Sequence, residues 1–135
     1  MANTITKQTL LDGDRNLVVK ITIEGDGSGE ESASSLIDIS DYTSGTGRVD
    51  DLDTVRINCI SGHLSGFAID LLWDATTNVI IATYQGEFDD KCSGGYGGLN
   101  NPKPTGYTGD ILFTTTGLGA GDKGYLILEM VKKYG

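Results

Sequence analysis

The segment Phe67–Tyr84 is the densest apolar stretch of the chain and reads FAIDLLWDATTNVIIATY. Side chains alternate along a strand, so one face of its first run carries four large apolar groups: Phe67, Ile69, Leu71 and Trp73. Two runs rich in β-branched and aromatic residues flank Asp74–Asn78, a pattern typical of a β-hairpin. A hairpin alone is only marginally stable in water, so we expect other strands to cover it.

Strand patterns recur along the rest of the sequence, and no segment has a helical period. The expected strands are Leu17–Glu24, Leu36–Tyr42, Thr54–Ile60, Ile111–Thr116 and Tyr125–Lys133. Met1–Leu11 is predicted to be an edge strand or an extended arm. Ser61–Gly66 and Gly117–Gly124 are predicted turns, and Gly25–Ser35 a mobile loop. Short strands separated by turns suggest a sandwich, jelly roll or barrel. We predict one all-β domain over residues 1–135, an antiparallel, jelly-roll-like sandwich of about eight strands.

Charge excludes some partners. The 135 residues carry 19 acidic and 10 basic side chains, a net charge of −9. Nucleic-acid phosphates and anionic membranes require clustered Lys and Arg, so we expect neither partner. The first residues show no signal peptide, and no apolar run approaches the roughly 20 residues of a membrane span. Cys59 is in phase with buried positions and is predicted to be a free thiol, whereas Cys92 lies in a loop. A disulfide between the two is the alternative.

No set of residues predicts catalysis, a metal or a cofactor. His63 is the only histidine, and its place in a predicted turn beside Ser61 and Ser65 does not establish a triad. The acidic turns lack the ligand spacing and flanking helices of an EF-hand; they contain Asp12, Asp14, Asp26, Glu30 and Glu31. Carboxylates suited to a glycosidase exist, namely Asp70, Glu87, Asp89 and Asp90, but any acidic chain offers such sets. Trp73 belongs to the core pattern, although an exposed Trp73 would favour sugar binding.

The glycine-rich segment Ser93–Gly109 is the clearest candidate for a contact surface. Tyr is enriched where protein surfaces meet, and Asn and Gly adapt to a partner. The residues expected to make contacts are Tyr96, Leu99, Asn100, Asn101 and Tyr107.

Several strings resemble small β-rich virion proteins of tailed bacteriophages. They are Leu71–Thr77, Thr108–Gly117, Ala120–Asp122, Tyr125–Glu129 and Lys132–Lys133, spread over about the last two-thirds of the chain. The resemblance implies a capsid decoration, or head cement, protein that stands on the capsid lattice, commonly as a trimer. It supplies no active-site residues.

The expected function is therefore a non-enzymatic virion protein that binds the major capsid protein and itself, as a homotrimer. It would assemble in the host cytoplasm and remain on the capsid surface. Anchoring is assigned to an N-terminal arm around Ile5 and Leu10 or to Ser93–Gly109, and self-contacts to Ile127 and Val131. A receptor- or carbohydrate-binding sandwich, as in a fibre tip, is the alternative.

Overall fold

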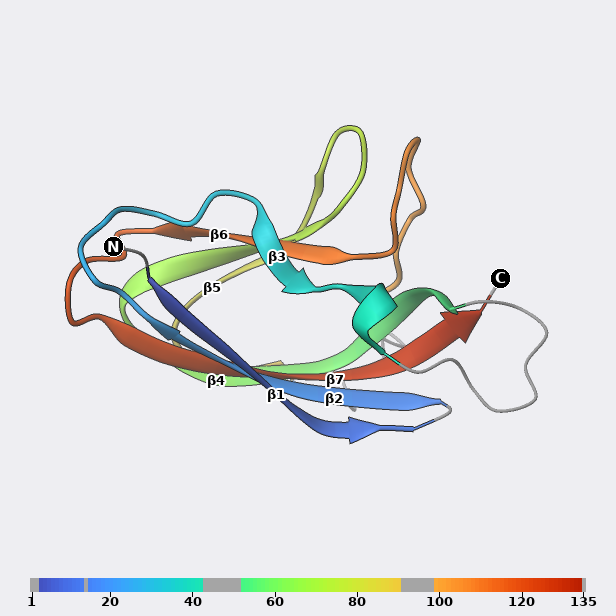
Figure 1. Cartoon of the computed structure of the whole chain (residues 1–135), viewed down its shortest axis with the longest axis horizontal. Coiled ribbons are helices and arrows are strands. Elements are labelled where there is room, and N and C mark those ends of the chain that lie inside the picture. The colour runs from blue at the N-terminus through green and yellow to red at the C-terminus, as the bar shows by residue number, and fades with distance from the viewer. Residues whose placement is uncertain (1–2, 14, 43–51, 91–98, 135) are drawn as a thin grey trace.

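The computed structural model describes residues 3–13, 15–42, 52–90 and 99–134, which form antiparallel strands around one core (Figure 1). The strands are β1 (Thr4–Asp12), β2 (Asn16–Glu24), β3 (Ser34–Ile37), β4 (Leu52–Trp73), β5 (Val79–Asp90), β6 (Ile111–Thr116) and β7 (Lys123–Tyr134). A single 3-10 turn, η1 (Ile39–Asp41), follows β3, and these ranges contain no α-helix. It follows that no described helix has the length or apolarity needed to cross a membrane.

Strand β4 organises the sheet. Along one edge it pairs first with β7 and then, from Ala68 onward, with β6; along the other edge it pairs with β5. The strand order is β1-β2-β7-β4-β6-β3, with β5 also on β4. In Figure 1, β4 runs along the lower layer with β1, β2 and β7, turns at the left, and continues in the upper layer with β3 and β6. The sheet thus curls over itself, and the prediction of an all-β, antiparallel, sandwich-like fold is confirmed.

The predicted turn at Ser61–Gly66 is wrong, because β4 continues through it without interruption. This joins two expected strands, so the described residues hold seven strands and not eight. The two glycines that suggested a turn, Gly62 and Gly66, have other structural roles. A Cβ on Gly62 would lie 2.1 Å from the carbonyl oxygen of Tyr125 in the neighbouring strand. Gly66 has φ +92° and lies in a bulge between Leu64 and Ala68, where β4 leaves β7 for β6.

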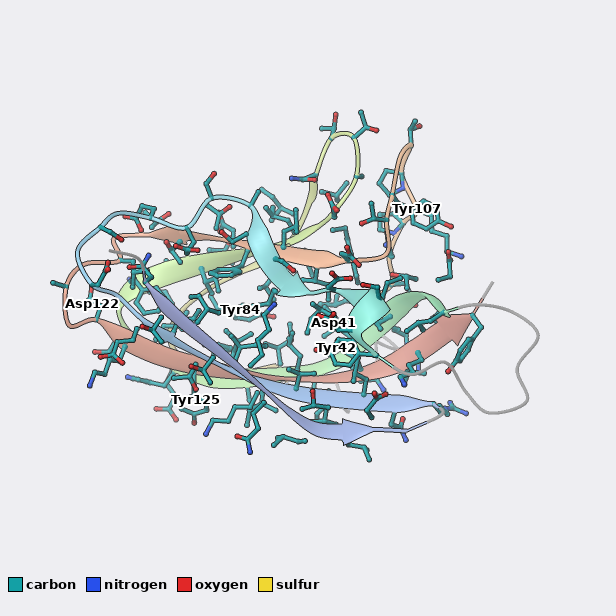
Figure 2. All side chains as sticks on the ribbon, in the orientation of Figure 1. Asp41, Tyr42, Tyr84, Tyr107, Asp122 and Tyr125 are labelled. Atoms are coloured by element: carbon teal, nitrogen blue, oxygen red, sulfur yellow. The ribbon has the colours of Figure 1, made fainter. Side chains whose placement is uncertain are left out.

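The central hairpin is confirmed, with Phe67, Ile69, Leu71 and Trp73 all at most 3% exposed. Its second strand departs from simple alternation. Leu72 pairs with Ile80 and Leu71 with Ala82, so Ile81 is an extra residue in β5. After this bulge Tyr84, not Thr83, packs against the core, and Figure 2 shows Tyr84 between the layers.

The connection Gly117–Gly124 was expected to close a hairpin, but β6 and β7 do not pair with each other. Both strands pair with the same edge of β4, one beyond the other, so the connection crosses between the layers. The expected strand Leu36–Tyr42 is also shorter than predicted. It ends at Ile37, because the Asp38 side chain accepts a hydrogen bond from the Ser40 N–H and starts η1.

The cysteine prediction is also wrong, since Cys59 is disulfide-bonded. Its side chain is buried, as its phase in the strand indicated, at 7% exposure. The sequence has one other cysteine, Cys92, which lies outside the described residues. The alternation of the strand therefore predicted that Cys59 is buried, but not that it forms a disulfide.

The gap between the edge strands β1 and β3 is bridged by the segment that was expected to be a mobile loop. The Asn3 side-chain amide donates to the Glu31 carboxylate and to the Gly29 carbonyl oxygen, both at 2.9 Å. The Thr115 N–H in β6 donates to the Glu31 carbonyl oxygen, also at 2.9 Å. Residues 25–33 are thus tied to both layers by hydrogen bonds.

Candidate binding surfaces

Two loops project together from the upper layer (Figure 1). One is the β4–β5 turn and the other belongs to residues 99–110. Backbone hydrogen bonds join them: the Thr76 N–H donates to the Thr105 carbonyl oxygen, and the Thr108 N–H to that of Asp74. The Thr108 hydroxyl also donates to the Asp74 carboxylate at 2.8 Å. We call these two loops, residues 74–78 and 102–108, the tip.

Side chains anchor the tip to the start of β4. The Tyr107 hydroxyl donates to the Asp53 carboxylate at 3.0 Å, and the Lys103 ammonium lies 3.0 Å from the same group. The hydrogen bond with Asp53 raises the pKa of Tyr107 and that of Lys103. Deeper in the structure, the Asn101 amide donates to the Thr54 hydroxyl at 3.1 Å, and both residues are buried.

Where the tip meets β5, a groove with a volume of about 290 Å³ opens on the surface. Ile80 on β5 lines it and is 63% exposed, the largest exposure among the described large apolar side chains. Leu99, Asn100 and the buried Trp73 also line it. Leu99 is held in place by hydrogen bonds in both directions with Ile57, at 2.7 and 3.0 Å. The exposed side chain of Ile80 therefore lies beside a backbone segment, at Leu99, that hydrogen bonds hold in place.

The contact residues predicted in Ser93–Gly109 fall into three groups. Leu99 and Asn100 are brought together in the groove, whereas Asn101 and Tyr107 are engaged in internal hydrogen bonds. Tyr96 lies outside the described residues. Sequence reasoning missed Ile80, since alternation made both faces of Val79–Tyr84 apolar and did not show which one is open.

The other predicted contact residues lie away from this groove. Residues 4–12 form the edge strand β1, one of the two expected outcomes, and Ile5 packs against the core while Leu10 is 48% exposed. Ile127 is half-buried on the outer face of the lower layer. Val131 is 5% exposed, so it offers little surface to a partner.

His63 lies on a strand and not in a turn. It is exposed on β4, opposite Tyr125 of β7 and Glu87 of β5. No hydrogen bond among the described residues joins it to Ser61 or Ser65. The arrangement that a nucleophile and its base need is therefore not formed by these side chains.

The acidic residues considered as cation ligands are engaged within the fold. The Glu30 carboxylate accepts hydrogen bonds from the Leu118 N–H, the Thr115 hydroxyl and the Gly117 N–H, which lower its pKa. Asp12 forms an ion pair with Lys132, whose side chain is fully buried. Asp14 lies outside the described residues, which contain no group of three His, Cys, Asp or Glu placed to hold a metal.

Comparison with known proteins gives no further guide to function. No model of a known protein family matches the chain, and no curated protein does.

Proposed function

We propose that this chain is a non-enzymatic structural protein of a tailed-phage virion that decorates and cements the outer surface of the capsid. The partners are the major capsid protein and further copies of the chain, as a homotrimer. The observation that carries the proposal is the tip with its adjoining groove, a preformed contact surface that displays Ile80. The resemblance in Leu71–Thr77 and Thr108–Gly117 supports it, because these strings lie in and beside the tip.

Rigid loops suit this role for an energetic reason. Ordering a glycine-rich segment on binding costs conformational entropy, and loops already fixed by internal bonds avoid that cost. Residues 99–110 are fixed by the bonds of Asn101, Tyr107 and Leu99. Many copies on one lattice also reinforce each other if they contact neighbours, so each contact can be weak.

An exposed Trp73 would favour the alternative, a receptor- or carbohydrate-binding sandwich. The indole of Trp73 is 3% exposed and packs in the core, so it offers no stacking platform. The position of Trp73 therefore does not favour this alternative.

The test is sedimentation of the purified chain with capsids that lack it, assembled from the capsid protein of the same genome. Replacing Ile80→Glu removes an exposed apolar contact and is expected to weaken binding about tenfold. Gln85→Glu, an exposed position on the same strand with the same new charge, is the matched control and is expected to bind within about twofold of wild type. Failure of the wild-type chain to bind would refute the proposal.

A further inference from the structure

A second groove lies on the outer face of the lower layer, away from the tip. It has a volume of about 360 Å³ and is lined by side chains of β2, β4 and β7: Lys20, Thr22, His63, Ser65, Lys123 and Tyr125. The sheet register explains this gathering. Thr22, Tyr125 and His63 are opposite one another on adjacent strands, and Lys123 is opposite Ser65. Figure 2 shows Tyr125 on the side of this layer that faces away from the upper layer.

The charge of this groove is opposite to that of the chain. Acidic residues outnumber basic ones 19 to 10, yet the groove is lined by two lysines and the histidine, with no carboxylate. The Lys20 ammonium lies 5.5 Å from the centre of the Tyr125 ring, a cation–π distance. Two acidic groups adjoin the groove but do not line it: Glu24 beside Lys123, and Glu87 opposite His63 on β5.

The Lys123–Glu24 pair is easily exchanged. The Lys123 Nζ and Glu24 Oε1 atoms are 3.8 Å apart, and the two side chains are 69% and 52% exposed. Water therefore screens the attraction between them. A carboxylate from another molecule can therefore take the place of Glu24 at little cost. The Tyr125 ring, 41% exposed, adds an apolar surface next to both ammonium groups.

We propose that this groove binds an acidic, extended segment of a partner protein, with carboxylates on Lys20 and Lys123 and an apolar side chain against Tyr125. The inference deepens the proposed function and rests on it for naming the partner as the capsid protein. A nucleic acid fits less well, because a net charge of −9 repels a long polyanion. A short acidic peptide carries fewer charges, so the net charge of the chain repels it less.

The first experiment measures capsid binding of the double variant Lys20→Glu/Lys123→Glu. The variant replaces two attractions between ammonium and carboxylate groups by two repulsions between carboxylates. Capsid binding is therefore expected to weaken about tenfold. The control Lys7→Glu/Arg15→Glu makes the same change in net charge at exposed positions of β1 and the β1–β2 turn. It is expected to bind within about twofold of wild type. Circular dichroism verifies that both variants fold, and Lys123→Gln provides a milder substitution if the double variant does not.

The second experiment does not need the capsid. A synthetic peptide of alternating Glu and Val is titrated into the isotopically labelled chain, with a Gln/Val peptide as its control. The Glu peptide is expected to shift the amide resonances of Thr22, Ser65 and Tyr125, and added salt to reverse the shifts. A capsid-binding failure with intact peptide shifts refutes only the proposed function. Unchanged capsid binding of the double variant, or the absence of shifts with the Glu peptide, would overturn the groove assignment.

Discussion

At the scale of single residues, Glu30 shows how a surface carboxylate can hold a connection in place. Its two oxygens accept hydrogen bonds from one hydroxyl and two backbone N–H groups at the start of the β6–β7 connection. Composition marked Gly25–Ser35 as flexible, because Gly and Ser have small side chains and acidic residues favour solvent. The ordering contact comes from residues about 85 positions away, a separation at which local pattern has no information.

Glu30→Gln is expected to lower stability at neutral pH, since an uncharged amide is a weaker acceptor for these donors. The folded-state pKa of Glu30 is lowered, so its contribution is fully present above the unfolded value of 4.5 and is lost as pH falls through the folded value. Urea unfolding at several pH values measures this. The acid-induced loss should be smaller in the variant than in wild type, and Glu87→Gln, exposed on β5, should behave as wild type does.

Gly62→Ala tests the close approach of β4 and β7. The new Cβ would lie 2.1 Å from the Tyr125 carbonyl oxygen, which is backbone and cannot move aside alone. We expect a loss of about 1–3 kcal/mol or more in the free energy of unfolding. Gly13→Ala, whose Cβ would meet only an ordinary contact at 3.7 Å, is the control. Equal stability of the two variants would show that the strands are not packed as described.

At the scale of elements, the sequence predicted strands better than it predicted their connections. Alternation identified the core faces of β2 and of the first strand of the central hairpin, because burial of one sheet face imposes a period of two. It misassigned Ser61–Gly66, since Gly and Ser favour turns but also allow close strand contact and a bend. It also could not show that Gly117–Gly124 crosses between layers, because strand pairing is set by contacts distant in sequence. In the candidate site, the sequence indicated Leu99 and Asn100 as contact residues but not Ile80.

The tip should loosen when its buried anchor is removed. Asn101→Ala loses the hydrogen bond to the Thr54 hydroxyl and the one accepted from the Lys103 N–H. The expected cost is about 1–2 kcal/mol. Hydrogen exchange of the Leu99 N–H should accelerate, because its bond to Ile57 depends on this segment. Asn100→Ala, at an exposed position, should leave that exchange rate unchanged; acceleration in both variants would count against Asn101 as the anchor.

At the scale of the whole molecule, the disulfide at Cys59 links stability to the redox environment. Disulfides persist in oxidising surroundings and are rare in a reducing cytoplasm. Dithiothreitol, or Cys59→Ser, is expected to lower the free energy of unfolding by about 2–4 kcal/mol. Urea unfolding with and without the reductant measures this effect. If dithiothreitol destabilised the Cys59→Ser variant by the same amount, the disulfide at Cys59 would not be the source of the effect.

The central claim is that the curled sheet is a scaffold that presents contact surfaces to a capsid. Cryo-electron microscopy of purified virions tests it most directly, with the copy number verified by quantitative mass spectrometry. The account predicts density for this fold at many equivalent positions on the outer capsid surface, with the tip against the shell and a segment of the capsid protein in the groove lined by Lys20 and Lys123. A few copies confined to the tail, or no copies in the particle, would contradict it.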